Sequence, residues 1–258
     1  MIIRKSQAEI ETMARAGAVV AGTLALLEEH IEPGVTTAEL DAIAEEFIRS
    51  HGGVATFKGY RGYPAATCLS PNDMVVHGIP GAVRLGEGDI LSVDVGVTLD
   101  GFVADSAWTF PVGAIAPETQ RLLDVCRAAL EAGIEQARPG NTVSDISRAV
   151  QTVTEEAGFG VIRSLVGHGV GRSMHEEPQV PNFVENKSSP KLRPGMTIAI
   201  EPMVNAGKAT VEILSDGWTV VTKDGLPSAH FEHTVLITEN EPEILTCAEK
   251  TPSALKVP

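Results

Sequence analysis

An internal repeat constrains the fold of this sequence more than any other feature. The motif Pro-Gly-x-Thr at positions 33–36 returns at positions 139–142, an offset of 106 residues. A second pattern, Leu-x-x-Gly followed by an acid, runs over positions 85–94 and returns at 192–201, an offset of 107 residues. The near-constant offset predicts two homologous halves, each built from the same order of helices and strands.

Each half is expected to run helix, turn, helix and then strands. Apolar residues recur with helical spacing over Ala14 to Leu27, Leu40 to Ile48, Leu122 to Ile134 and Val143 to Val153. Strand-like apolar runs cover Ile90 to Val97, Phe102 to Phe110, Thr197 to Val204, Trp218 to Thr222 and Phe231 to Thr238. Thr36 and Thr142 are expected to cap the second helix of each half. These patterns predict a single α+β domain over residues 1–258, with halves of approximately 10–110 and 117–240.

The composition excludes several classes of protein. With 20 Lys and Arg residues against 34 Asp and Glu residues, the net charge is −14, so no broad basic field exists for a nucleic acid. The three cysteines are an odd, widely spaced set that favours free thiols in a reducing compartment: Cys68, Cys126 and Cys247. The N-terminus has no signal-peptide core, and no uninterrupted apolar run approaches the ~20 residues of a membrane span. The longest apolar stretch, from Ala14 to Leu27, is interrupted by Arg15 and Thr23 and predicts a core helix. We therefore expect a cytoplasmic protein without an N-terminal extension.

Two aspartates lie inside the apolar strand pattern, where acids are rare. Asp94 belongs to the run from Ile90 to Val97, and Asp105 belongs to the next run, after Asp100-Gly101. A hairpin turn on Leu99-Asp100 places residue 105 opposite Asp94, whereas a turn on Asp100-Gly101 places residue 107 there. Either register leaves the two acids on one face within ~4.5–8 Å. Like charges so close in a buried setting require a positive group between them.

Two glutamates repeat this anomaly. Glu201 lies in Ile-Ala-Ile-Glu-Pro-Met, and Glu232 lies in Phe-Glu-His-Thr-Val-Leu. A single such acid is most simply a strand-end residue that reaches solvent. Four of them, two related by the repeat, favour a cage for divalent metal ions.

Three histidines stand in unusual contexts. His168 and His175 lie seven residues apart in a glycine-rich segment, and His77 lies in Val-Val-His-Gly-Ile-Pro. A lone histidine of this kind is more often a packed core residue than a ligand. The rival motifs of phosphate-binding loops, dinucleotide-binding loops, His-Glu-x-x-His metalloproteases and serine hydrolases are absent from the sequence.

The order of these acids and of His168 resembles the ligand set of the methionine aminopeptidases of type I, in their short bacterial form. The five residues are Asp94, Asp105, His168, Glu201 and Glu232. The resemblance spans roughly Ile2 to Ile244 and implies the pita-bread fold, with two pseudo-symmetric halves, an antiparallel sheet inside and helices outside. It also implies a hydrolase that removes the initiator methionine from nascent proteins, prefers a small second residue, and attacks the first peptide bond with hydroxide generated by two metal ions.

The resemblance assigns roles to these residues. Asp105 and Glu232 would bridge the two ions, His168 and Glu201 would complete one ion site, and Asp94 would complete the other. Glu201 would also serve as general base or proton shuttle. His175 would stabilise the tetrahedral intermediate and His77 would orient the peptide. The pocket for the methionine side chain would be lined by Phe57, Tyr60, Tyr63, Cys68, Met174 and Trp218.

The implied cofactors are two divalent ions, and the oxygen-rich ligand set favours manganese, iron or cobalt. Asn72 and Ser228 would help to bind a monovalent cation, as in some relatives. The expected partners are peptides and nascent chains with N-terminal methionine, no membrane and no nucleic-acid substrate, and the chain is expected to be a monomer. A transient ribosome contact would use the domain surface, for which a modest basic cluster is available, although a solvated loop is the simpler interpretation: Lys187, Lys191 and Arg193.

Three alternatives remain open. Xaa-Pro aminopeptidases and prolidases share the fold but usually carry a large extra N-terminal domain. Type II methionine aminopeptidases need a helical insertion, for which the 31 residues between Glu201 and Glu232 leave little room. Non-catalytic binding proteins of this fold lose metal ligands, whereas all five are present here.

Overall fold

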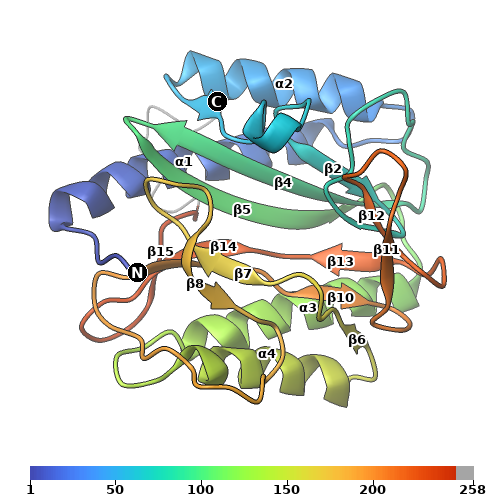
Figure 1. Cartoon of the computed structure of the whole chain (residues 1–258). Coiled ribbons are helices and arrows are strands. Elements are labelled where there is room, and N and C mark those ends of the chain that lie inside the picture. Colours follow the sequence, from blue (N-terminus) through green and yellow to red (C-terminus); the bar gives the residue numbers. More distant parts are fainter. Residues whose placement is uncertain (248–258) are drawn as a thin grey trace.

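Two pairs of helices enclose the strands of this protein. The computed structural model describes residues 1–247. The helices are α1 (Gln7–His30), α2 (Thr37–Ser50), α3 (Pro117–Glu135) and α4 (Val143–Glu156). In Figure 1, α1 and α2 lie on one side, α3 and α4 lie on the other, and the strands run between them. This arrangement confirms the predicted α+β fold of two pseudo-symmetric halves with strands inside and helices outside.

The second helix of each half begins at the predicted threonine. Thr36 forms a capping box, because its hydroxyl accepts from Glu39 N and its own N–H donates to the Glu39 carboxylate at 2.8 Å. Thr142 forms the same box with Asp145. Both threonines also form isolated antiparallel bridges, with partners 84 and 191 of the chain. The two helix starts are thus held in equivalent ways in the two halves.

A hairpin of two ten-residue strands forms the centre of the first half. It consists of β4 (Ile90–Leu99) and β5 (Phe102–Pro111), joined at Asp100-Gly101, where both residues have positive φ values of 48° and 78°. This turn places Ala107 opposite Asp94. Of the two predicted registers, the one with the turn on Asp100-Gly101 is therefore correct. The short strands β1 (Val54–Ala55) and β2 (Cys68–Pro71) pair with β4 on its other edge.

The second half differs from the prediction at its two long strands. The run from Thr197 to Val204 is divided into β9 (Thr197–Ile200) and β10 (Met203–Asn205), because Pro202 has no N–H for a ladder. The run from Phe231 to Thr238 contains only β14 (His233–Leu236), and β13 (Ser228–His230) precedes it. β9 pairs with β14 and β10 pairs with β13. Glu201 and Glu232 therefore lie at facing breaks of these strands, not within them.

The remaining strands have two to five residues each. They are β3 (Met74–Val76), β6 (Gly160–Val161), β7 (Gly167–Gly169), β8 (Glu176–Val180), β11 (Val211–Ile213), β12 (Val220–Thr222) and β15 (Glu243–Ile244). β7 and β8 extend the sheet of β9, β14 and β15, while β11, β12 and β3 form a small separate sheet. Trp218, predicted to begin a strand, lies just before β12.

Helix α1 is long and apolar enough to cross a membrane by length and composition alone. Its Val20, Leu24 and Leu27 are instead buried in a core cluster that also contains Val93 and Val95 of β4. This packing confirms the prediction of a core helix. The bounds proposed for the two halves, 10–110 and 117–240, stay predictions. The end of the domain at residue 258 also stays a prediction, since residues 248–258 lie outside the described part of the chain.

Candidate active site

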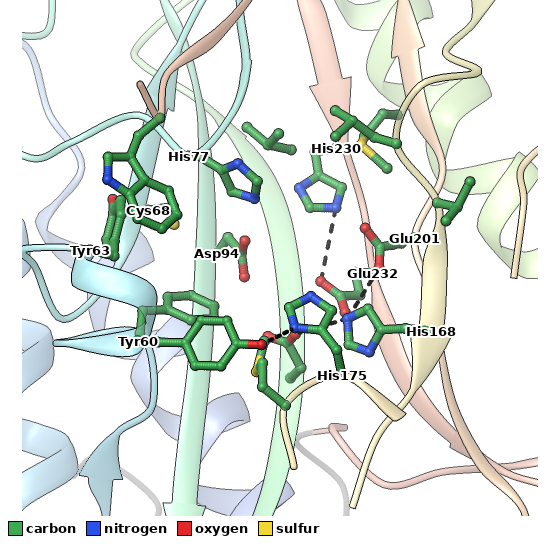
Figure 2. A pocket seen from close by; sticks show the side chains of 18 of the residues that line it. Tyr60, Tyr63, Cys68, His77, Asp94, His168, His175, Glu201, His230 and Glu232 are labelled. Atoms are coloured by element: carbon green, nitrogen blue, oxygen red, sulfur yellow. Dashed lines mark hydrogen bonds and ion pairs between the residues drawn. The ribbon is translucent and has the colours of Figure 1, made fainter. Parts of the chain in front are cut away.

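A cavity of about 200 Å³ lies between the two halves. All five predicted metal ligands line it, and Figure 2 shows the side chains of four of them directed toward its centre: Asp94, His168, Glu201 and Glu232. The ligands come from distant parts of the chain: Asp94 on β4, Asp105 on β5, His168 on β7, Glu201 after β9 and Glu232 before β14. The fold therefore brings together residues separated by up to 138 positions, from 94 to 232.

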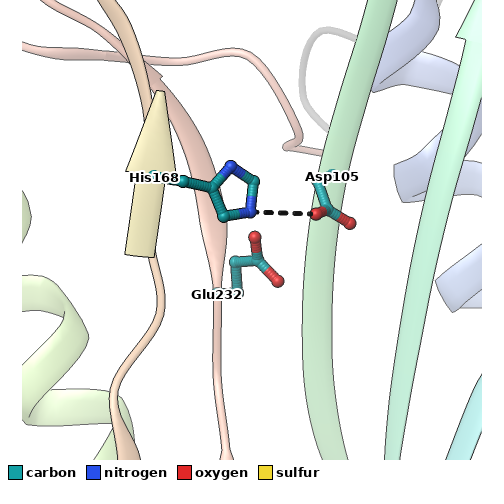
Figure 3. A group of neighbouring side chains, drawn as sticks. All are labelled: Asp105, His168 and Glu232. Carbon is teal, nitrogen blue, oxygen red and sulfur yellow. Dashed lines mark ion pairs between the residues drawn. The ribbon is translucent and has the colours of Figure 1, made fainter. Parts of the chain in front are cut away.

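Three of these side chains are spaced like ligands of one ion. One ligand atom from each of Asp105, His168 and Glu232 lies within 4.8 Å of the others (Figure 3). His168 Nε2 lies 3.8 Å from Asp105 Oδ2 and 3.5 Å from Glu201 Oε1. His168 Nδ1 donates to the carbonyl oxygen of Gly169 at 2.9 Å, which leaves the Nε2 lone pair directed at the carboxylates.

The buried carboxylates have unmet bonding capacity. Asp94 Oδ1, Asp105 Oδ1 and Glu232 Oε1 are buried and have no hydrogen-bond partner within residues 1–247. A buried anionic oxygen without a partner is strongly destabilising unless a cation compensates it. Four carboxylates and one imidazole fit two divalent ions that share ligands.

The pKa values agree with a site built for cations. Burial raises the pKa of Asp94 to about 7. Burial, together with repulsion from the neighbouring carboxylates, raises the pKa of Asp105, Glu201 and Glu232 well above the usual range. Burial lowers the pKa of His168 to about 4, so its imidazole is neutral near pH 7 and free to bind a metal.

The two predicted outer histidines approach this cluster from different sides (Figure 2). His77 has a φ of 59°, an uncommon conformation for a residue with a side chain, and burial lowers its pKa. The ring of His175 stacks on that of Tyr60, and its centroid lies 4.2 Å from the centroid of the His168 ring. Its Nδ1 shares a 2.8 Å hydrogen bond with Tyr60 Oη. The hydroxyl of Tyr60 thus fixes the orientation of an otherwise exposed imidazole.

The predicted methionine pocket forms one end of the cavity. The residues that line it are Phe57, Tyr60, Tyr63, Cys68, Met174 and Trp218. The ring of Tyr63 contacts that of Trp218 edge-on at 5.1 Å and that of Phe57 at 6.4 Å. The Tyr63 hydroxyl is occupied by the carbonyl oxygens of residues 67 and 78, and burial raises the pKa of the Cys68 thiol. An uncharged, aromatic slot of this kind suits a thioether.

One buried residue of the site was missed. His230 is 2% exposed, and neither of its ring nitrogens has a hydrogen-bond partner in the described chain. Its Nε2 lies 3.9 Å from Glu232 Oε2, and burial lowers its pKa to about 3. Its position two residues before a predicted ligand was an available signal. Four apolar residues that line the cavity were also not predicted: Val76, Leu165, Val166 and Met203.

The residues predicted to form a monovalent-cation site and a ribosome contact have the following neighbours. Asn72 and Ser228 are in contact, because Ser228 N donates to Asn72 O at 2.9 Å, but Asn72 Oδ1 already accepts from Ile90 N. In the basic cluster, Lys187 forms an ion pair with Glu185 at 2.7 Å. Both the monovalent-cation site and the ribosome contact remain predictions.

Comparisons with known proteins extend these findings. The sequence pattern of metallopeptidase family M24 matches residues 11–239. Methionine aminopeptidase 1 of Bacillus subtilis is 50% identical over 246 residues, covering 95% of this chain and 99% of its own length. The crystal structure of methionine aminopeptidase from Thermotoga maritima has a TM-score of 0.94 at 46% identity, covering 96% of this chain and all of that one. A prolidase from Pyrococcus furiosus has a TM-score of 0.78 at 25% identity, and the match covers only 65% of its chain. The chain belongs to metallopeptidase family M24 and, within it, to the methionine aminopeptidases.

Proposed function

We propose that this chain is a metalloaminopeptidase that removes the initiator methionine from nascent polypeptides and prefers a small second residue. One observation carries the proposal: the five carboxylate and imidazole side chains and the aromatic slot open into the same cavity. The similarity to methionine aminopeptidases over nearly the whole chain supports it. The retention of all five ligands argues against a non-catalytic binding protein of the same fold.

The ligand set suits two divalent ions of manganese, iron or cobalt. Asp105 and Glu232, at the centre of the cluster, would bridge the ions, with His168 and Glu201 completing one site and Asp94 the other. When bound, such ions lower the pKa of water and polarise a peptide carbonyl group.

The side chains around this centre would handle protons and charge. Glu201, whose pKa is raised by burial, is suited to accept a proton from the attacking water and deliver it to the leaving amine. His175, held by Tyr60, would donate to the oxygen that becomes negative in the transition state. His77 lies on another side of the cavity and would orient the peptide.

The shape of the cavity would determine the substrate. The aromatic slot would take the methionine side chain, since the rings of Phe57, Tyr63 and Trp218, of which Tyr63 contacts the other two edge-on, line the cavity. Val76 and Met203, which also line the cavity, belong to a separate buried cluster against which Leu165 packs. Once the methionine side chain of a substrate occupies a cavity of about 200 Å³, little room would remain for a bulky second residue of that substrate.

The experiment is release of methionine from Met-Ala-Ser by the purified protein with manganese, iron or cobalt under anaerobic conditions. We expect release from this peptide, and little from Met-Leu-Ser or from N-acetylated Met-Ala-Ser. Asp105→Asn should abolish release, whereas the matched variant Asp100→Asn, at the exposed hairpin tip, should retain it. Equal release from the acetylated peptide, or no release with any of the metals, would overturn the proposal.

The cellular setting remains an expectation. Action on nascent chains in the cytoplasm by a monomer, with transient ribosome contact, accords with this function. Sedimentation of the protein with purified ribosomes, with and without charge reversal at Lys187 and Lys191, measures such contact directly.

A further inference from the structure

The segment before helix α1 reaches the loop that carries two residues of the site. We call residues 1–6 the N-terminal arm and residues 171–176 the His175 loop. The Lys5 ammonium bonds to Glu176 Oε2 at 2.7 Å, and the two side chains are only 3% and 8% exposed. The arm is fixed at the same residue, since Lys5 N donates to the carbonyl oxygen of Gly195 at 2.6 Å.

The same glutamate organises the backbone of the His175 loop. Glu176 Oε1 accepts from the backbone N–H groups of Arg172 at 2.8 Å and Ser173 at 3.2 Å. The Glu176 carboxylate therefore bonds to the N-terminal arm through one oxygen and to the His175 loop through the other. His175 and Met174 lie between the residues that it holds, and His175 is held in addition by its hydrogen bond to Tyr60.

Gly171 shows how closely the two parts fit. A Cβ at this position would lie 2.4 Å from Lys5 Cε, 2.7 Å from Lys5 Nζ and 2.8 Å from Glu176 Oε1. The ammonium group is thus seated directly against the loop backbone, and a side chain at residue 171 would displace it.

Two other polar contacts of the His175 loop involve Arg172 and Gly171. Arg172 pairs with Glu9 at 2.9 Å and lies over the ring of Phe102, but its side chain is 65% exposed. Exposed ion pairs contribute little to stability. Val103 N donates to the carbonyl oxygen of Gly171, which fixes only the start of the loop. A buried pair, by contrast, leaves an uncompensated charge when either partner is removed.

We propose that Lys5 is a positioning residue for the aminopeptidase reaction, which makes the N-terminal arm part of the active-site structure. This inference rests on the proposed function. Lys5 holds Glu176, Glu176 holds the loop, and the loop directs His175 and Met174 into the cavity. Lys5 lies outside residues 11–239, which the family pattern matches. A displacement of about 1 Å in a reacting group lowers a rate about 100-fold.

The test compares five variants with the wild type. Lys5→Met and Glu176→Gln each break the pair, and the double variant removes both charges while keeping an amide oxygen for the loop N–H groups. Arg4→Met is the matched control, because Arg4 is an exposed residue of the same arm that bonds only to the carbonyl oxygen of Pro194 in the described chain. Leu130→Ala, in the core of the second half, is a general destabilisation control.

Three quantities are measured for each variant: hydrogen exchange of the amides of residues 172 and 173, kcat and KM for Met-Ala-Ser, and Tm. We expect Lys5→Met to accelerate exchange at both amides by about tenfold or more and to lower kcat/KM by about 100-fold. The double variant should regain part of both losses. Arg4→Met should behave like the wild type, and Leu130→Ala should lower Tm without changing kcat/KM well below its Tm.

Unchanged exchange at the two amides in both single variants would overturn the proposal. The proposal would also be overturned if Lys5→Met and Leu130→Ala had the same kcat/KM when each is assayed at the same interval below its own Tm. If the wild type itself released no methionine, the proposed function would fail, while the exchange measurement would still decide whether Lys5 holds the loop.

Discussion

Replacing Asp94 by asparagine should stabilise the metal-free protein while weakening its response to metal. Asp94 has a buried oxygen without a hydrogen-bond partner in residues 1–247, and burial raises its pKa from 3.8 to about 7. The folded state therefore binds the proton of this carboxyl group more tightly than the unfolded chain does. It follows that stability is lost as the pH rises from about 4 through 7, and that the loss is complete above pH 7.

The size of this effect follows from the two pKa values. A difference of one in pKa corresponds to about 1.4 kcal/mol. Relative to acid pH, where the carboxyl group is protonated in both states, the raised pKa of Asp94 thus destabilises the metal-free fold by about 4 kcal/mol at pH 8 and by about 2 kcal/mol at pH 5.5. An asparagine side chain still leaves about 1–2 kcal/mol of unmet hydrogen bonding. The net gain is about 2–3 kcal/mol at pH 8 and less than about 1 kcal/mol at pH 5.5, the former equivalent to about 4–12 °C in Tm.

The assay is thermal unfolding of chelator-treated protein at both pH values, repeated with manganese. Asp94→Asn should show the higher Tm at pH 8 without metal and a much smaller increase on adding metal than the wild type. Asp100→Asn, in the same hairpin but exposed and paired only with Arg15 in the described chain, should change Tm little at either pH. A metal-free Asp94→Asn protein less stable than the wild type at pH 8 would refute the reasoning about the burial of this carboxyl group.

Three further substitutions test individual contacts. Tyr60→Phe removes the hydrogen bond to His175 and should lower kcat about fivefold with little change in KM; an unchanged kcat would show that the hydroxyl does not position the imidazole. Thr234→Val removes the hydroxyl that bonds both the N–H and the carbonyl oxygen of Asp105, and should lower Tm by about 4–10 °C in thermal unfolding. A smaller loss would indicate that water replaces the hydroxyl. Met174→Ala enlarges the aromatic slot and should raise KM for Met-Ala-Ser about tenfold. It should also lower Tm, because Met174 belongs to a buried core cluster, and an unchanged KM would place the methionine side chain elsewhere.

Much of the fold was predictable because local chemistry agreed with the final structure. The threonine caps, the apolar spacing of the helices and the Asp100-Gly101 turn are local features that need no knowledge of distant contacts. The breaks at Glu201 and near Glu232 were not foreseen. They depend on each strand changing partners between two sheets, and apolar residues lie on both sides of each break.

The candidate site was likewise predictable in some residues and not in others. Acids in apolar runs are visible in a sequence because their burial contradicts their chemistry, and all five proposed ligands indeed line one cavity. His230 was missed because a single histidine beside stronger candidates carries no separate signal. Lys5 was missed for a different reason, since its partner Glu176 lies 171 positions away and charged residues near a terminus are usually solvated.

The most direct test of the two-ion centre is anomalous diffraction from crystals of the protein grown with Mn(II). We predict two anomalous peaks within one cavity, with Asp105 and Glu232 contacting both, His168 and Glu201 contacting one, and Asp94 contacting the other. Peaks at other residues, or a single peak at saturating metal, would contradict the bridging arrangement on which the proposed function depends.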